Sequence, residues 1–418
     1  MRNIKKVLAL VLVAVLCLSC FAACSKSGNT DATTAADDKT TVADETTAAD
    51  KTTAAGEETP AASGTFKIGS IGPLTGKAAI YGKAVMNGAK IAVEEINAKG
   101  GIQFEFQAQD DANDAETSVN AYNTLVDWGM QILMGTVTTT PCISVAAESF
   151  KDRVFTLTPS ASSTDVIDGK DNAFQVCFTD PNQGMASADY ISENLTGKKV
   201  AIIYRNDDAY SQGIRDTFAA EAKEKNVEIV YEGTFTESTS TDFSAQLTGA
   251  QSAGADIVFL PIYYEPASVI LKQASDMGYA PTFFGVDGMD GILTLDGFDT
   301  KLAEGVMLLT PFSADAEDEA SKNFVAKYKE KYKETPNQFA ADAYDAIYII
   351  AEAINKAGCT GDMSAADICE KLVAVMPTIT FDGITGAGVP MTWQATGEVS
   401  KGPRAVVIEN GVYVTPGK

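Results

Sequence analysis

Hydroxyl side chains cluster at the ends of two predicted strands. The strand at 130–135 runs into TVTTTP (136–141), and the strand at 154–159 runs into SASSTD (160–165). Thr140 followed by Pro141 predicts a helix with Thr140 as its N-cap, and the serine cluster predicts a second helix start. Free amides and hydroxyls at two convergent helix starts would suit a carboxylate. The alternative is plain helix capping, which Ser and Thr perform in most proteins.

Acidic and phenolic side chains follow three strands in the second half of the chain. The sequence places DDAYS (207–211), YYE (263–265) and Asp287-Gly288 at these strand ends. Carboxylates and phenols can hold an ammonium group by charge, hydrogen bonds and ring faces. Together with the hydroxyl clusters they would suit a zwitterion, that is, an amino acid. The alternatives are a turn role for Asp287 and simple packing for the tyrosines.

Composition excludes several classes of protein. The 418 residues contain no histidine, which removes Ser-His-Asp and Cys-His nucleophiles and His-ligated zinc. A formal net charge of −24 disfavours nucleic acid as a partner. The chain has no dinucleotide fingerprint, no P-loop and no nucleophile elbow. We therefore expect a binding protein without a cofactor rather than an enzyme.

Strands and amphipathic helices alternate from about Thr65 to the end, which predicts an α/β protein with two doubly wound lobes. The predicted strands are 66–72, 104–109, 130–135, 154–159, 199–205, 228–235, 256–262, 281–286, 305–310 and 404–409. The predicted helices are 83–99, 242–253, 266–277, 319–334, 337–357 and 364–376.

The first 64 residues have the pattern of a secreted lipoprotein. A basic start and a short apolar run predict a signal peptide over residues 1–23, and Ala22-Ala23-Cys24 resembles a lipobox, so we expect lipidation at Cys24. Cys20 and ordinary cleavage are the alternatives. Residues 24–64 then form a Thr/Ala/Asp-rich stretch that cannot bury a core, which predicts a disordered tether. The protein would be anchored by lipid on the outer face of the cell membrane.

Four cysteines lie in the body of the chain, and their spacing indicates no metal site. Cys359 and Cys369 are near in sequence and could close a small disulfide loop, whereas Cys142 and Cys177 have the look of ordinary buried cysteines.

The order of motifs resembles the leucine/isoleucine/valine-binding proteins of bacterial ABC transporters. The motifs are IGSIGPLTGKAAIYG (68–82), GAKIAVEEINAKGGI (88–102), QDDAND (109–114), LTPSASS (157–163), FTDPNQG (178–184), DDAYSQG (207–213) and FDGITGAG (381–388). The resemblance implies the type I periplasmic-binding fold, with Rossmann-like lobes joined by a three-crossing hinge. Lobe 1 would be 65–182 with 312–402, and lobe 2 would be 183–311 with 403–418. The crossings would lie near Pro181, Pro311 and Pro403.

The same resemblance implies the ligand-binding residues. Thr139 and Ser162 match hydroxyl donors, and Thr138 and Ser160 match positions that use main-chain groups. The remaining matches are the second-lobe tyrosines, the acidic residue facing the amine and two pocket-lining aromatics: Tyr210, Tyr263, Asp287, Tyr81 and Phe339. The chain departs from the best-known members in having Asp287 where they have Glu, and Asn113 and Thr138 where they carry a disulfide.

The implied function is a substrate-binding lipoprotein that delivers an amino acid, branched-chain by resemblance, to an ABC permease. We expect a monomer. The alternatives are a sensory receptor of the same fold, or an importer receptor for an amide, urea or an aromatic acid.

Overall fold

The computed structural model describes residues 61–386 and 388–416. The predicted signal peptide, the lipidation site Cys24 and the tether up to residue 60 lie outside the described residues. The last tether residues are part of the fold, because Ser63 N donates to Cys359 O at 3.3 Å and Gly361 N donates to Ser63 O at 2.9 Å. No helix among the described residues is long and apolar enough to span a membrane.

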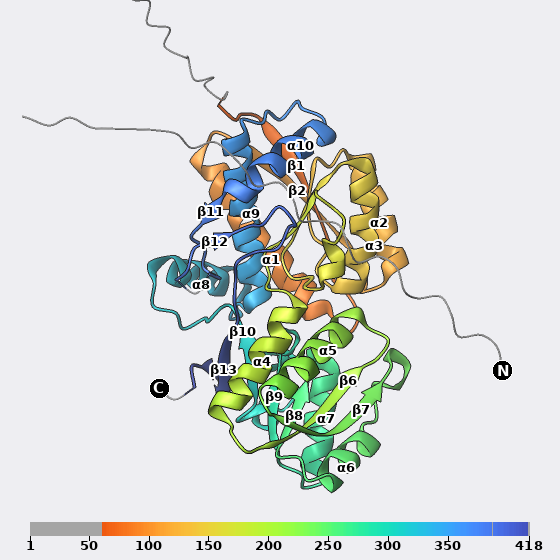
Figure 1. Ribbon diagram of the computed structural model, residues 1–418. Coiled ribbons are helices and arrows are strands. Elements are labelled where there is room, and N and C mark those ends of the chain that lie inside the picture. Colours follow the sequence, from red (N-terminus) through yellow and green to blue (C-terminus); the bar gives the residue numbers. More distant parts are fainter. Residues whose placement is uncertain (1–60, 387, 417–418) are drawn as a thin grey trace, which may run out of the picture. The chain divides into compact units, whose positions relative to one another are not determined.

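Five parallel strands form the first sheet in the order β2-β1-β3-β4-β5 (Figure 1). They are β1 (Thr65–Gly72), β2 (Gln103–Asp110), β3 (Ile132–Met134), β4 (Phe155–Thr158) and β5 (Ala173–Gln175). Strand alternation divides their side chains between two cores: Ile132 and Met134 join one, and Leu133 joins the other.

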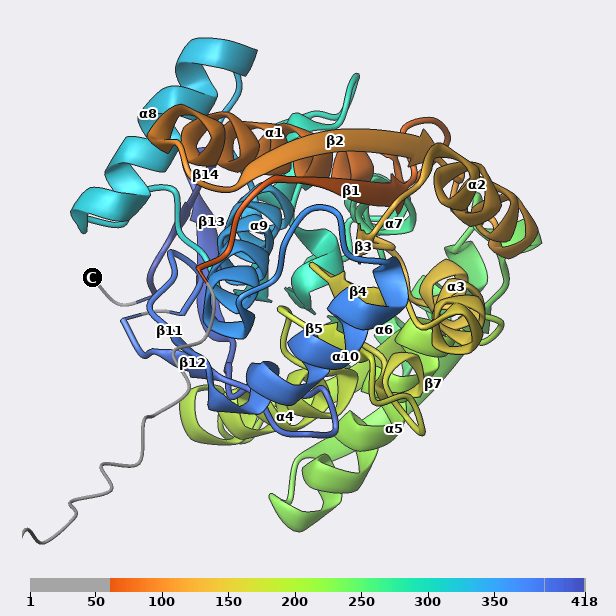
Figure 2. The same ribbon diagram turned by 90° about the horizontal axis from the view of Figure 1, so that it is seen from above.

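Helices cover both faces of this sheet (Figure 2). Helices α1 (Ala79–Lys99) and α9 (Gln338–Ala357) pack side by side on one face, and α2 (Ala115–Trp128) packs beside α3 (Thr139–Asp152) on the other. Helix α10 (Ala365–Val375) packs against α9 and β4. We call the first sheet with these five helices lobe 1.

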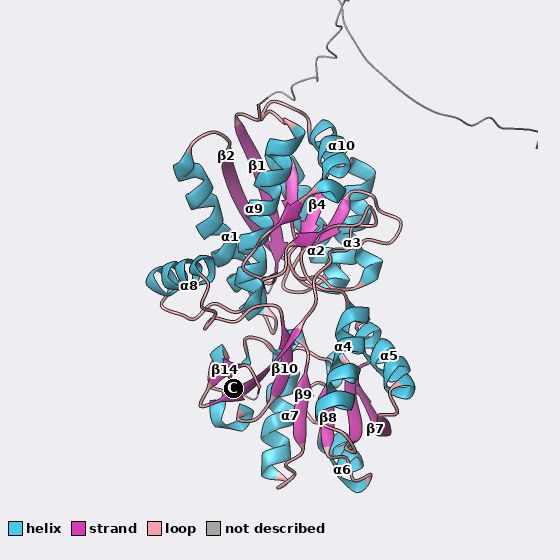
Figure 3. Ribbon diagram, turned by 60° about the vertical axis from the view of Figure 1, so that its left-hand side comes forward, coloured by secondary structure: helices cyan, strands magenta, loops and turns pink. Residues whose placement is uncertain are grey.

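The second sheet has the order β14-β13-β10-β9-β8-β6-β7. Its parallel strands are β6 (Lys199–Arg205), β7 (Glu228–Phe235), β8 (Ile257–Leu260), β9 (Thr282–Gly285) and β10 (Met307–Thr310). Strand β13 (Arg404–Glu409) is antiparallel to β10, and β14 (Val412–Val414) is antiparallel to β13. Helices α4 (Asp180–Asn194) and α5 (Ala209–Glu224) cover one face, and α6 (Ser244–Ser252) and α7 (Tyr264–Asp276) cover the other (Figure 3). We call this assembly lobe 2.

The chain passes between the two sheets at three places. It leaves the first sheet after β5 and enters α4, it leaves β10 at Thr310 toward α8 (Glu319–Tyr332) and α9, and it returns through a short hairpin to β13. That hairpin consists of β11 (Thr380–Phe381) and β12 (Met391–Thr392). The predicted lobe boundaries near Pro181, Pro311 and Pro403 stay predictions.

The α/β class and the two mainly parallel sheets confirm the predicted fold class, and each of the ten predicted strands is present. Two local predictions were wrong. Helix α3 begins at Thr139 with Thr138 as its N-cap, so Pro141 is its third residue rather than its first. The serine cluster starts only a three-residue 3-10 helix, Thr164–Val166, capped by Ser163.

The four cysteines of the body, Cys142, Cys177, Cys359 and Cys369, are all buried free thiols. The possible disulfide between Cys359 and Cys369 is therefore not formed in the structure.

Candidate functional site

One small cavity collects most of the residues singled out in the sequence. Its lining combines lobe 1 and lobe 2, and it borders about 230 Å³ of space not filled by atoms. The lining residues are Tyr81, Val137, Thr138, Thr139, Ser160, Tyr210, Tyr263, Asp287, Gly288 and Phe339. Ser162 is the one predicted residue outside this lining. The cavity lies beyond the carboxyl ends of the strands, where doubly wound sheets bind ligands.

The lobe 1 side of the cavity offers hydrogen-bond donors. The Oγ1 atoms of Thr138 and Thr139 are buried and have no hydrogen-bond partner. The first hydrogen bond within α3 runs from Cys142 N to Thr138 O at 3.0 Å. The backbone N–H groups before Cys142 therefore have no partner within the helix. Unpaired hydroxyls beside a helix N-terminus make a favourable place for a carboxylate.

Ser160 and Ser162 differ in what they offer. The Ser160 hydroxyl donates to Val137 O at 2.6 Å, so its side chain is already used inside lobe 1. The Ser162 Oγ is fully buried and has no partner. The cavity therefore meets Ser160 mainly through its main chain, whereas the Ser162 hydroxyl is free to bond a further group.

The lobe 2 side of the cavity is anionic. Asp287, which begins a 3-10 helix after β9, is 4% exposed, and Tyr210 Oη donates to its Oδ1 at 2.5 Å. Burial raises the pKa of Asp287 to about 7, against the lowering effect of hydrogen bonds with Tyr210 and Gln183. An ammonium group at this position would pair with the buried carboxylate and lower its pKa again.

Gly288 keeps Tyr210 in place. Its amide donates to Tyr210 Oη at 2.9 Å, and a Cβ at this position would lie 2.6 Å from the same oxygen. Any side chain would therefore displace the phenol that orients Asp287.

Aromatic rings close the cavity. The ring centroids of Tyr81 and Phe339 are 4.3 Å apart, and Tyr263 lies 5.4 Å from Tyr81 and 4.9 Å from Tyr210. The Tyr81 hydroxyl also bridges the lobes by donating to Gly288 O and accepting from Tyr264 N. This wall suits an apolar group rather than a second charge.

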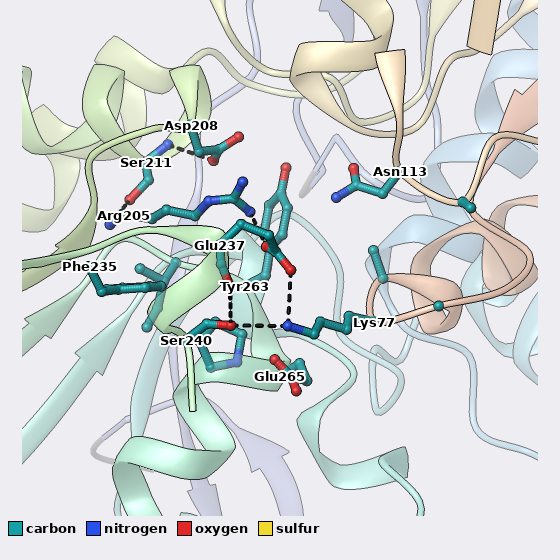
Figure 4. A pocket seen from close by; sticks show the side chains of 15 residues that line it. Lys77, Asn113, Arg205, Asp208, Ser211, Phe235, Glu237, Ser240, Tyr263 and Glu265 are labelled. Carbon is teal, nitrogen blue, oxygen red and sulfur yellow. Dashed lines mark hydrogen bonds and ion pairs between the residues drawn. The ribbon is translucent and has the colours of Figure 1, made fainter. Parts of the chain in front are cut away.

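A larger hollow of about 1000 Å³ adjoins the cavity and shares Tyr263 with it (Figure 4). Lys77 of lobe 1 reaches across it to Glu237 Oε1 at 2.9 Å and Ser240 Oγ at 3.0 Å, and Arg205 holds the other Glu237 oxygen at 2.6 Å. We call Lys77, Glu237, Ser240 and Arg205 the rim cluster.

The sequence did not point to the rim cluster, to Val137, or to Gln183. Lys77 and Glu237 are 160 residues apart, and no local pattern links them. The sequence could have indicated Gln183, because this residue lies within the FTDPNQG motif. The described residues contain no group of three or more Cys, Asp or Glu side chains arranged to hold a metal ion.

Residues 65–408 match the periplasmic binding protein family. The chain is 32% identical over 341 residues to Leu/Ile/Val-binding protein homolog 3 of Brucella melitensis, covering 80% of this chain and 88% of that protein. A branched-chain amino acid transporter substrate-binding protein from Streptococcus pneumoniae, solved with isoleucine, is 30% identical with a TM-score of 0.75, covering 84% of this chain and 98% of that one. A solute-binding protein from R. palustris, solved with benzoate, has a TM-score of 0.76 at 20% identity, covering 85% and 96%; this likeness concerns the fold alone.

Proposed function

We propose that this chain, which belongs to the periplasmic binding protein family, captures a free branched-chain amino acid outside the cytoplasm and presents it to the permease of an ABC importer. The family consists of solute-binding proteins, and the chain is not an enzyme. Its ligand would be returned unchanged.

The opposite chemistry of the two cavity walls carries this proposal. Unpaired hydroxyls and the start of α3 face the cavity from lobe 1, and Asp287 with Tyr210 faces it from lobe 2. A zwitterion would satisfy both walls at once, carboxylate toward Thr139 and ammonium toward Asp287. An acid without an amine would leave Asp287 buried and unpaired, which is costly.

The aromatic wall supports an aliphatic side chain. Tyr81, Tyr263 and Phe339 present ring faces and edges to the cavity, and such surfaces favour an apolar group. The Brucella relative is named for leucine, isoleucine and valine, and the Streptococcus relative was solved with isoleucine. Asp287 in place of the Glu of the best-known members leaves more room near the amine.

The mode of attachment and delivery is proposed from the sequence. Cys24 would carry the lipid after removal of residues 1–23, and the tether would let the body move above the membrane. Closure of the lobes on the ligand would give the form that the permease recognises.

Thermal unfolding of the ligand-stripped protein tests the proposal. We expect leucine, isoleucine or valine at about 100 times its dissociation constant to add roughly 2.7 kcal/mol of stability, whereas benzoate and urea should add none. An increase in the unfolding temperature with benzoate alone would indicate that the ligand is an aromatic acid. No shift with any of the twenty amino acids would refute the amino-acid proposal.

A further inference from the structure

A second buried carboxylate, which is not part of the cavity lining, has no hydrogen-bond partner for either of its oxygens. Asp180, the first residue of α4, is 1% exposed, and neither of its carboxylate oxygens accepts a hydrogen bond. Its amide donates to Ser162 O at 2.9 Å, which holds the residue beside the unpaired Ser162 hydroxyl. Two adjacent buried polar side chains without partners cost stability unless they are satisfied in the bound state.

The fold keeps space for this carboxylate. A Cβ on Gly213 of α5 would lie 3.1 Å from Asp180 Oδ2, so the glycine leaves room for the oxygen at a cost of about 1 kcal/mol relative to alanine inside a helix. Gly213 stands three residues after Tyr210, whose hydroxyl bonds Asp287. Asp180 therefore points toward the turn of α5 that carries the ligand-facing tyrosine.

The charged groups that act most strongly on the pKa of Asp180 are all acidic. Burial is the main cause that raises the pKa of Asp180, and Asp287, Asp208 and Asp165 raise it further. The nearby Ser162 hydroxyl lowers this pKa, although the two side chains do not meet in hydrogen-bond geometry. Among the ion pairs of the described residues, none includes Asp180 or Asp287. In the unliganded protein, Asp180 and Asp287 thus lie among acidic groups, and neither has a cation partner in an ion pair.

We propose that Asp180 is the second carboxylate of the ammonium subsite, so that the ligand's ammonium group compensates Asp180 as well as Asp287. The Ser162 hydroxyl accepts an N–H bond from the ammonium and donates its own proton to Asp180. An ammonium group has three donors, enough for Asp287, Ser162 and one further acceptor. Asp180 acts through Ser162 and through its charge, and is a positioning residue.

This inference rests on the proposed function and narrows its ligand class. Two buried carboxylates select ligands with a cationic amine over carboxylic acids of the same shape. They also predict a trade-off, because an unpaired buried charge that serves binding destabilises the empty protein.

The test compares Asp180→Asn with Glu193→Gln, which removes one carboxylate charge from the exposed end of the same helix. Titration calorimetry of the full mature protein uses L-leucine and 4-methylpentanoate, which is leucine without its amino group. We expect Asp180→Asn to weaken leucine at least tenfold, to leave 4-methylpentanoate unchanged or tighter, and to keep or raise the unfolding temperature without ligand. Glu193→Gln should match the wild type in all three.

An equal loss for both ligands, or no loss for leucine, would overturn the role of Asp180. Gly213→Ala provides a second variant, because its methyl group crowds the Asp180 oxygen while favouring the helix. It should also lower the preference for leucine over 4-methylpentanoate, and an unchanged preference would count against the inference. A wild type that binds neither leucine nor any other amino acid would instead refute the proposed function itself.

Discussion

Two of the groups of buried carboxylates in the described residues differ in whether their charges are paired within the chain. One group, which we call the α9 network, consists of Asp342, Asp345, Thr385 and Lys401 and fastens the β11–β12 hairpin to lobe 1. The other consists of Asp180 and Asp287 and lies at the cavity. Both groups are almost completely buried.

Every carboxylate of the α9 network has partners within the chain. Lys401 donates to Asp342 and to Thr385 Oγ1, with side-chain exposures of 1% and 3% for the ion pair. Asp345 accepts from Ile384 N at 3.1 Å, from Thr385 N at 2.9 Å and from the Thr385 hydroxyl at 2.6 Å. This network is complete without a ligand.

The two carboxylates of the cavity group lack such a set of partners within the chain. Asp287 accepts one short hydrogen bond from Tyr210, and Asp180 accepts none. Burial of a charge is tolerated where the chain supplies the counter-charge, and where it does not, an external cation is the natural complement. In our proposal, the paired carboxylates hold the fold, and the unpaired carboxylates at the cavity bind the ligand.

Breaking the α9 network should give the largest effect on stability. Lys401→Met leaves Asp342 charged, buried and unpaired, so we expect a loss of about 3–5 kcal/mol in the free energy of unfolding. Denaturant titration measures it. Asp342→Leu combined with Lys401→Met should recover much of the loss, because no unpaired charge remains. A single variant as stable as the wild type would contradict the assigned role of the pair.

Removing the charge of Asp287 should weaken ligand binding without lowering the stability of the unliganded protein. Asp287→Asn should weaken leucine binding by more than tenfold, because the ammonium loses its principal counter-charge, while the unliganded protein keeps or gains stability. Calorimetry and thermal unfolding on one preparation measure both quantities. Loss of stability together with unchanged affinity would place Asp287 with the structural carboxylates instead.

The affinity should depend on pH through the same carboxylate. Asp287 has a pKa of about 7 in the unliganded protein, raised by burial and by Asp342 of α9, with Tyr210 of α5 and Gln183 of α4 acting in the opposite direction. Because the folded pKa exceeds the unfolded value of 3.8, this group's contribution to unliganded stability is complete below pH 4 and is lost as the pH rises toward 7.

Binding an ammonium group requires the ionised form, so leucine affinity should rise with pH. We expect an increase approaching tenfold per pH unit between pH 5.5 and 7, with proton release on binding below pH 7. Calorimetry in buffers of different ionisation enthalpy detects the protons. Asp287→Asn should make the profile shallower, and a wild-type affinity that does not change across this range would disprove the linkage.

The sequence predicted the strands, and the grouping of the candidate residues around one cavity, better than the helix starts. Strand ends fix which side chains reach the cavity, and the motif order placed eight predicted residues in its lining. The start of α3 was misplaced because Thr138, Thr139 and Thr140 are all able to cap, and tertiary contacts choose among them. Helices α2, α4 and α5 were not predicted, although α2 buries Ser118, Ala121, Tyr122 and Leu125 at helical spacing.

The sequence alone could not predict which buried charges are paired. Lys401 meets Asp342 across 59 residues, and Asp180 meets Ser162 across a short 3-10 helix and strand β5. A motif can show that an aspartate is present, but whether that aspartate is satisfied depends on side chains brought together by the fold. That distinction decides between structural and ligand-binding roles.

The Lys77–Glu237 pair of the rim cluster should give the smallest effect, because both of its charges are half exposed. Lys77 and Glu237 are each 49% exposed in their side chains, and such pairs contribute about 0.2–1 kcal/mol. Lys77→Met should therefore weaken leucine by no more than about fivefold, mainly through faster dissociation, because the ion pair joins the two lobes across the mouth of the cleft. Stopped-flow dissociation at low and high salt measures it, with Lys90→Met on the exposed face of α1 as the control. The difference between the variants should shrink as salt screens the pair. A larger loss that salt does not change would mean that Lys77 is a buried partner of the ligand rather than an exposed clasp.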